Sequence, residues 1–129
     1  MLAIDTNLVI RFLTADDPRQ TVDARRLIEG HNVFVCTTVL LEAAWVLRSI
    51  YRYPNGPLVE ALRAFAGLPR VTLEDPRLIA RVLDWAEAGI DFADALHLAS
   101  AADCDAFVTF DRRLIETARR VKAGTVRTP

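Results

Sequence analysis

Four carboxylates occupy positions that ordinary surface solvation does not explain. Asp5 and Asp111 each follow directly on a short apolar stretch that we expect to form a strand. Glu42 and Asp94 lie in otherwise apolar stretches that we expect to form helices. Four acids gathered in one cleft would repel one another and raise some of their own pKa values. A hard divalent cation relieves that repulsion, and oxygen-only ligands favour Mg²⁺ or Mn²⁺ over Zn²⁺. The set therefore predicts a metal site.

Glu42 is the only polar residue of the stretch VLLEAAWVL, which covers residues 39–47. A helix that is apolar on every side is expected to be buried, and Glu is almost never fully buried without a partner. Glu42 is therefore expected to meet a cation, take up a proton or line a polar cleft. A structural salt bridge to an arginine is the alternative that involves no metal.

Asp94 belongs to a narrow polar seam on a second apolar helix, which we expect from Asp91 to about Asp103. Asp94, His97 and Ser100 are spaced three residues apart and so share one face of that helix. Asp91 is expected to cap the helix, and an acid in the first turn also interacts favourably with the positive helix end. Capping explains Asp91 well, and Asp94 stays a candidate ligand.

The acids at the strand ends have a structural interpretation as well, because Asp5 and Asp111 can each cap the helix that follows. Taken jointly, the four acids predict an all-carboxylate site, and such a site with Mg²⁺ suits the hydrolysis of phosphodiester bonds. Two ions about 3.5–4 Å apart can activate water and stabilise both the attacking and the leaving oxygen, so no His or Lys base is required. The glycine-rich patterns of P-loop and dinucleotide-binding proteins are absent from the sequence.

Apolar strands and helices alternate along the chain, which predicts an α/β protein with a parallel sheet covered by helices on both faces. In such folds ligands bind beyond the carboxyl ends of the strands, where Asp5 and Asp111 stand. The first strand is expected to be buried. We expect strands at residues 2–4, 33–36, 71–73 and 106–110 with an edge strand at 125–127, and helices at 6–13, 18–30, 38–51, a stretch ending at 66, 76–86, 91–103 and from 111 onward.

Length and composition predict one folded domain over residues 1–129, since 52% of the residues are apolar and 26% are charged. No apolar run approaches the ~20 residues that span a bilayer, and Asp5 interrupts the opening, so neither a membrane span nor a signal peptide is expected. Cys36 and Cys104 are expected to be reduced and buried, as in a cytoplasmic protein. The net charge of −1 gives no bulk electrostatic argument for a nucleic-acid ligand, although several arginines occur in pairs.

Four segments together resemble the PIN domain family and, more narrowly, the VapC-type toxins of bacterial toxin–antitoxin pairs. They are LAIDTN at residues 2–7, LLEAAWVL around Glu42, DFADALHLASA at residues 91–101 and FVTFDRRL at residues 107–114. The resemblance covers essentially the whole chain in the family's order and spacing. It implies a PIN-like three-layer α/β/α sandwich with a central, mainly parallel sheet, and a ribonuclease that depends on Mg²⁺ or Mn²⁺.

Carried over residue by residue, the resemblance assigns the catalytic and metal-binding roles to four acids, namely Asp5, Glu42, Asp94 and Asp111. The supporting positions around them are Thr6, Asn7, Asp91 and Thr109. Arg112 and Arg113, beside the last acid, are our prediction for contacts to RNA phosphates. The resemblance further implies a homodimer, an RNA substrate and a co-encoded antitoxin protein whose C-terminal segment covers the acidic cleft.

Two other classes of protein remain open on the sequence alone. A PIN-fold module that binds a partner without catalysis would keep the same elements. A haloacid-dehalogenase-like phosphatase also begins with a strand that ends in Asp, but it would carry a second Asp two residues on, where this chain has Asn7. Metal-dependent cleavage that is lost in Asp5→Asn or Asp94→Asn variants separates the nuclease from the interaction module.

Overall fold

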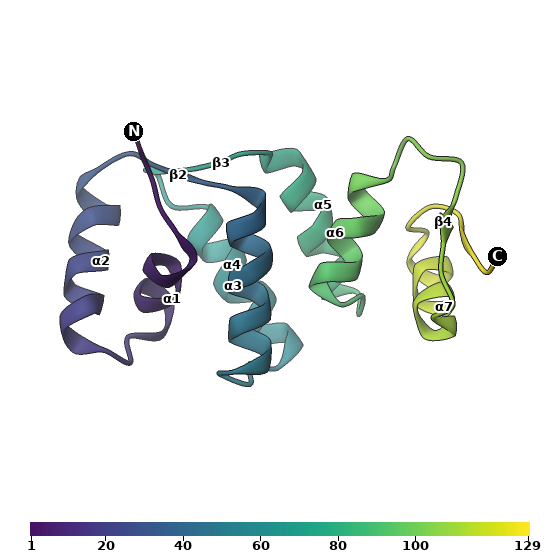
Figure 1. The fold of residues 1–129 in the computed structure, drawn as a ribbon, viewed down its shortest axis with the longest axis horizontal. Helices are drawn as coiled ribbons and strands as arrows, with labels where there is room; N and C mark the ends of the chain where they lie inside the picture. Colours follow the sequence, from purple (N-terminus) through teal and green to yellow (C-terminus); the bar gives the residue numbers. More distant parts are fainter. The chain divides into compact units, whose positions relative to one another are not determined.

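A computed structural model describes the whole chain, residues 1–129 (Figure 1). Contacts within the chain divide it into two compact units, Met1–Pro76 and Arg77–Pro129, which we call unit 1 and unit 2 and describe separately. The elements are, in chain order, β1 (Leu2–Ala3), α1 (Thr6–Thr14), α2 (Pro18–Gly30), β2 (Val33–Val35), α3 (Thr37–Ser49), α4 (Asn55–Ala66), β3 (Val71–Leu73), α5 (Pro76–Glu87), α6 (Phe92–Ser100), β4 (Phe107–Val108), α7 (Arg112–Val121) and β5 (Val126–Arg127).

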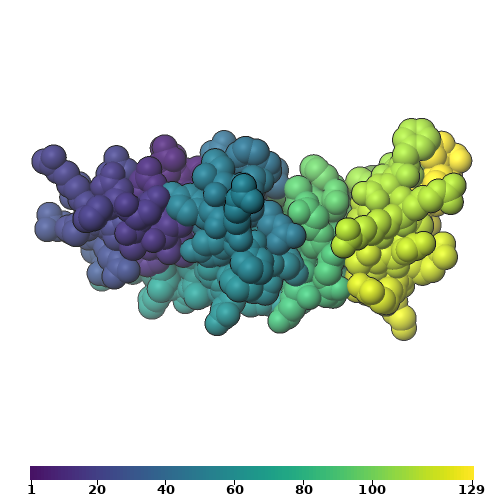
Figure 2. Space-filling model, turned by 90° about the horizontal axis from the view of Figure 1, so that it is seen from below, coloured from purple at the N-terminus to yellow at the C-terminus, as the bar shows by residue number.

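The strands of unit 1 form one parallel sheet in the order β1-β2-β3. Leu2 lies opposite Val33, and Val33 lies opposite Val71, so the carboxyl ends of all three strands reach the same edge of the sheet. Helix α1 packs against α2 and α3, and α4 packs against α3 and β3. The space-filling view shows the side chains of this unit, coloured purple to teal, in close contact (Figure 2). Its core includes the fully buried Val9, Leu47 and Phe65.

Local sequence signals set the start of α2. The carboxylate of Asp17 accepts a hydrogen bond from the amide of Gln20 at 3.1 Å, and Pro18 takes the first helical position, where its missing N–H costs nothing. The reciprocal bond of a capping box is absent, because the side-chain oxygen of Gln20 instead accepts from Nε of Arg11 at 2.6 Å. The cap is therefore one-sided, and Gln20 serves a contact between α1 and α2.

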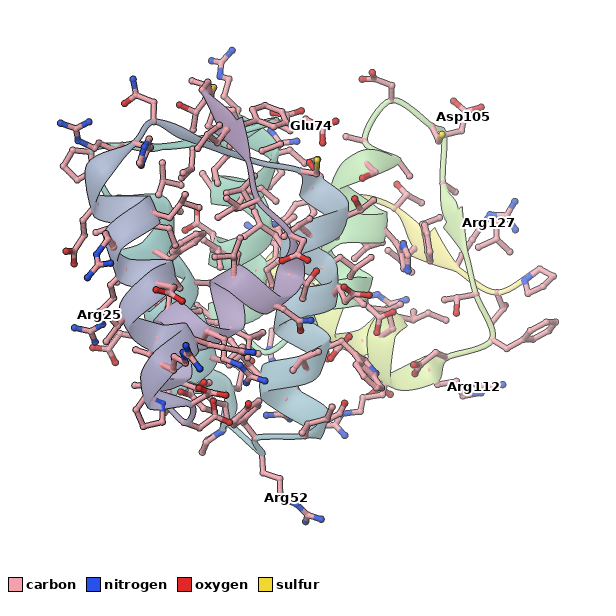
Figure 3. All side chains as sticks on the ribbon, turned by 60° about the vertical axis from the view of Figure 1, so that its left-hand side comes forward. Arg25, Arg52, Glu74, Asp105, Arg112 and Arg127 are labelled. Atoms are coloured by element: carbon pink, nitrogen blue, oxygen red, sulfur yellow. The ribbon has the colours of Figure 1, made fainter.

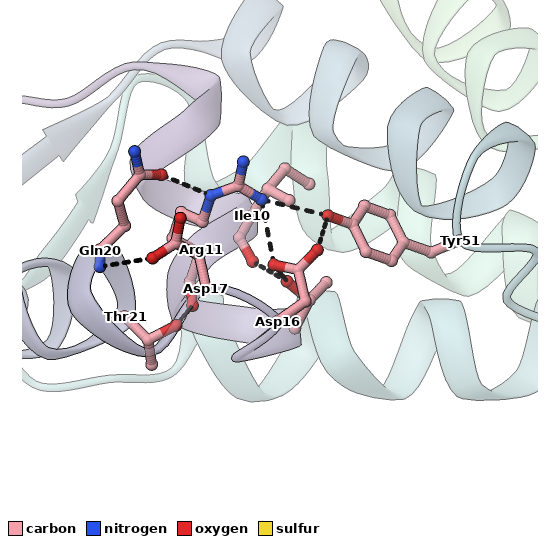
Figure 4. Close-up of polar contacts among 8 residues, drawn as sticks. Ile10, Arg11, Asp16, Asp17, Gln20, Thr21 and Tyr51 are labelled. Carbon is pink, nitrogen blue, oxygen red and sulfur yellow. Dashed lines mark hydrogen bonds and ion pairs between the residues drawn. The ribbon is translucent and has the colours of Figure 1, made fainter.

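That contact belongs to a polar network around Arg11 that joins three segments of unit 1 (Figure 4). Nη1 of Arg11 donates to Oδ1 of Asp16 at 3.0 Å and to the hydroxyl oxygen of Tyr51 at 3.1 Å. The Tyr51 hydroxyl in turn donates to Oδ2 of Asp16 at 2.5 Å. This hydrogen bond holds the pKa of the Asp16 carboxyl below its usual value. The network ties α1 and the α1–α2 turn to the segment that follows α3.

Unit 2 pairs β4 and β5 as parallel strands, with α7 as the connection between them. Phe107 lies opposite Val126 in this pair. The apolar faces of α5 and α6 supply most of the core, which also includes Ile90 from the turn between the two helices. Nη2 of Arg120 donates to the carbonyl oxygen of Ala88 at 3.3 Å and so links α7 to the turn after α5.

The predicted α/β fold class is confirmed. Seven helices alternate with parallel strands, which is compatible with the three-layer α/β/α sandwich. Within the units the strands are hydrogen-bonded as one set of three and one set of two. No helix is long and apolar enough to cross a bilayer.

Three details of the sequence interpretation are wrong. The first strand is not buried: Leu2 is 44% exposed, because β1 is the edge strand of its sheet. The strand expected at 106–110 is shorter than expected and leaves Phe110 85% exposed. Both cysteines are free thiols, but neither is buried: Cys36 is half-buried, and Cys104 is exposed because it lies in the turn between α6 and β4.

Candidate active site

Asp5 stands at the carboxyl end of β1 and begins α1. Its Oδ1 accepts a hydrogen bond from the amide of Leu8 at 3.1 Å, so the capping role expected for it is real. The carboxylate is exposed, and its second oxygen is not used in the cap. Of its two neighbours, Thr6 is buried in the first turn of α1, whereas Asn7 is exposed. Asp5 can thus cap the helix and still present an oxygen to a ligand.

Glu42 lies on the exposed face of α3. The expectation that α3 is buried on every side is wrong, because only the face with Leu40, Ala43 and Leu47 packs into the core of unit 1. One turn after Glu42, Trp45 is 61% exposed on the same side of the helix. Glu42 forms no salt bridge, so the arginine partner that we considered is absent. Its carboxylate is free to bind a cation.

Glu74 is a positioning residue that the sequence interpretation missed. It follows β3 as Asp5 follows β1, and its amide donates to the carbonyl oxygen of Val35 at 3.0 Å. Its Oε1 accepts from the amide of Thr37, the first residue of α3, at 2.9 Å. Cys36, the residue before the helix, provides no side-chain cap, so Glu74 fills that role from the neighbouring strand. Its position directly after an expected strand is the sequence signal that could have identified Glu74.

We expect Glu74→Ala to lower the free energy of unfolding by about 1 kcal/mol, because losing a side-chain cap costs roughly that much. Glu74→Gln keeps an oxygen acceptor at the same place and is expected to lose less than half as much. Urea unfolding followed by circular dichroism measures both variants. An alanine variant as stable as the wild type would contradict the capping role.

The polar seam on α6 is present in the structure. Asp91 caps the helix through Oδ2, which accepts from the amide of Ala93 at 3.1 Å. Asp94 is partly exposed in the first turn, and His97 and Ser100 follow on the exposed side. The apolar residues of the helix are mostly buried, so the seam is a single polar line on an apolar helix.

Asp94 lies in the field of two other carboxylates. Partial burial is the main cause that raises its pKa above the usual value, and the negative charges of Asp91 and Asp111 raise it further. His97 acts in the opposite direction. Asp94 and Asp111 belong to different elements, so the fold of unit 2 brings together two acids that are well separated in the sequence.

Asp111 follows β4 and caps α7, where its Oδ1 accepts from the amide of Leu114 at 3.1 Å. The amide of Asp111 itself donates to the hydroxyl oxygen of Thr109 at 3.0 Å. Thr109 therefore fixes the backbone that carries the acid. Arg112 and Arg113 are the first two residues of α7, and both are exposed; Arg112 extends away from the ribbon (Figure 3).

The structure thus places the candidate acids in two sets. Asp91, Asp94 and Asp111 lie in unit 2, and Asp5 and Glu42 lie in unit 1. No three His, Cys, Asp or Glu side chains approach closely enough to hold a metal ion. The chemistry of the donors still fits a hard cation, because all are carboxylates and the mutual repulsion at Asp94 is the kind that a cation relieves. The complete four-acid set stays a prediction.

Parallel strands, and helices capped by acids that follow two of those strands, define an α/β protein. A family model described as the PIN domain matches residues 2–120, and the chain belongs to this family. The match spans most of the chain and includes residues of both units. PIN domains are typically nucleases that use divalent metal ions. Among curated proteins, none matches the chain.

Proposed function

We propose that this protein is an endoribonuclease that depends on Mg²⁺ or Mn²⁺ and hydrolyses RNA phosphodiester bonds. The observation that carries the proposal is that the charges of Asp91 and Asp111 act on Asp94 within unit 2, in a chain that belongs to the PIN domain family. Two of these acids begin helices, and one of those helices directly follows a strand. Acids from separate elements that share one field are what a metal-dependent hydrolase requires.

In this proposal four acids hold the metal, namely Asp5, Glu42, Asp94 and Asp111. When bound, the metal would supply Lewis-acid chemistry and lower the pKa of water to near neutrality. The chain contributes rigid placement of the carboxylates: the cap bonds fix Asp5 and Asp111, and Thr109 fixes the backbone at Asp111. Asp91 caps the helix that carries Asp94, and Asn7 adds an exposed amide beside Asp5.

The same proposal extends to the biology of the protein. The four segments that resemble VapC-type toxins support a role as the toxin of a toxin–antitoxin pair. The protein would then form a homodimer, cleave RNA and bind a co-encoded antitoxin protein. Because a single family match includes residues of both units, we treat residues 1–129 as one nuclease domain.

The test is cleavage of single-stranded and structured RNA by the purified chain with Mg²⁺, with Mn²⁺ and with EDTA. We expect cleavage with either metal and none with EDTA. RNA binding with no cleavage under any of these conditions would instead support the alternative of a PIN-fold module without catalysis. The family match gives no support to the haloacid-dehalogenase-like alternative.

We expect replacement of both Arg112 and Arg113 by Ala to weaken RNA binding about tenfold, since each exposed arginine can neutralise one phosphate. Neither side chain has an ion-pair partner in the chain. Fluorescence anisotropy with labelled RNA in EDTA measures the affinity, and the metal-induced rise in Tm should stay as in the wild type. Unchanged RNA affinity would remove both arginines from the RNA contact.

A further inference from the structure

Unit 2 contains a second charged feature at the opposite end of α7 from Asp111. A hollow of about 590 Å³ is lined by Arg119, Lys122, Gly124, Thr125, Val126 and Arg127. Three of its six lining residues are cations, and none is an acid. We call Arg119, Lys122 and Arg127, with the Gly124–Thr125 turn between them, the basic groove. Arg127 extends outward from the ribbon in Figure 3.

The cations of the basic groove have no carboxylate partner. None of Arg119, Lys122 and Arg127 forms a salt bridge. Arg127 donates to the backbone carbonyl of Thr128 at 3.0 Å, which leaves its charge uncompensated. Residues 112–129 as a whole contain six Arg or Lys residues and a single acid, Glu116. A concentration of positive charge of this kind attracts anions even though the net charge of the chain is −1.

Structural roles account for only part of this charge. Arg119 and Lys122 lie at the C-terminus of α7, where cations interact favourably with the helix dipole. Arg127 lies on β5, outside the helix, and the dipole does not explain it. Gly124 has a φ of 89°, which turns the chain sharply after α7. The amides of Gly124 and Thr125 donate to no other group of the chain, and both residues are exposed.

An aromatic side chain lies beside the basic groove. A second hollow of about 390 Å³ shares Lys122, Gly124 and Thr125 with the first and is also lined by Arg81 and Trp85. The guanidinium carbon of Arg81 lies 5.9 Å from the centre of the Trp85 ring, and the Trp85 side chain is only partly buried. Proteins that bind single-stranded nucleic acid combine a positive groove for the backbone with aromatic faces for the bases.

From this arrangement we infer that the basic groove binds the phosphate backbone of single-stranded RNA, at the opposite end of α7 from Asp111. The inference rests on the proposed function for the identity of its ligand and adds the place where the RNA strand is held. Arg119 and Arg127 can each grip a phosphate with two parallel hydrogen bonds, and Lys122 adds a point charge. The ten residues of α7 span about 15 Å, so a strand that contacts Arg112 can continue along this helix to the groove.

The test compares two triple variants of the full chain that remove the same charge. The groove variant is Arg119→Gln, Lys122→Gln and Arg127→Gln. The control variant is Arg19→Gln, Arg26→Gln and Arg70→Gln, three exposed arginines of unit 1. Binding of a fluorescein-labelled single-stranded RNA of about 20 nucleotides is measured by anisotropy in EDTA at several salt concentrations. The Tm of each variant confirms that it is folded.

We expect the groove variant to lose about tenfold or more in affinity at low salt. The slope of log K against log salt should become shallower by about 2, since each phosphate contact to a single strand contributes about 0.7. The control variant should change affinity by no more than about twofold and keep the wild-type slope. Equal losses in both variants would overturn the inference, because they would reflect net charge alone.

Cleavage kinetics separate this inference from the proposed function. If the wild type cleaves RNA, the groove variant should raise KM and leave kcat unchanged. If the wild type binds but does not cleave RNA, the nuclease proposal fails, and a loss of affinity confined to the groove variant still supports the groove. A groove variant that binds RNA normally but no longer binds an acidic peptide would overturn the RNA assignment.

Discussion

Asp94→Asn is expected to lower kcat/KM for RNA cleavage by about 100-fold or more while the protein stays folded. The substitution removes one negative charge and one metal-binding oxygen, and loss of a single group that stabilises charge in the transition state typically costs 10²–10³-fold. Asp94 is the candidate acid with the strongest structural support, because the charges of both Asp91 and Asp111 act on it. The measurement is single-turnover cleavage of a labelled RNA in Mg²⁺ and in Mn²⁺.

The matched control is Asp105→Asn. Asp105 is an exposed acid of the same unit, in the turn before β4, and it extends into solvent (Figure 3). This variant should cleave RNA at the wild-type rate. Equal activity of the Asp94→Asn variant and the wild type would contradict a catalytic role for Asp94.

The stability of the Asp94→Asn variant should change in the opposite direction from its activity. The pKa of Asp94 is raised in the folded state, so the native protein favours the protonated carboxyl and loses stability as the pH rises through that pKa. In metal-free buffer near pH 7, the Tm of the asparagine variant should therefore equal that of the wild type or exceed it by up to about 2 °C. Below about pH 3.9, where the carboxyl is protonated in both states, the difference should vanish. Loss of activity together with a lower Tm would point to misfolding instead.

The strand ends and helix caps were predictable from the sequence because their causes are local. Asp5, Asp91 and Asp111 each cap the helix expected for them, and β3 has the expected bounds. The polar seam with Asp94 was predictable for the same reason, since three-residue spacing is a property of one helix. These features depend on a few consecutive residues, so they can be predicted without knowledge of any long-range contact.

The errors concern contacts that the sequence does not record. Apolar residues on every side of α3 indicated that the helix is buried. Trp45 is nevertheless exposed, because only one face of the helix packs into the core of unit 1. The edge position of β1 depends on strand order, which a two-residue strand does not reveal. Glu74 caps α3 from another strand, so its role becomes visible only once β2 and β3 are paired. The basic groove likewise combines α7 with β5.

Mg²⁺ or Mn²⁺ is expected to raise the Tm of the wild type by about 5 °C when the free metal is about tenfold above its Kd. A ligand that binds only the folded state at that concentration contributes about 1.4 kcal/mol, which corresponds to a shift of this size in a chain of 129 residues. Glu42→Gln should lose much of this rise, because an amide oxygen binds a hard cation less strongly than a carboxylate does. Differential scanning fluorimetry with and without EDTA measures both effects.

Glu60→Gln is the control for Glu42→Gln, because Glu60 is an exposed acid on α4 of the same unit. The two substitutions remove the same charge. Both residues lie on helices, so the two variants also match in local structure. We expect the Glu60→Gln variant to show the full metal-induced rise. Since Glu42 has no salt bridge to lose, a reduced rise confined to the Glu42→Gln variant would reflect lost metal binding. An equal rise in both variants would remove Glu42 from the ligand set and leave the metal to Asp5, Asp94 and Asp111.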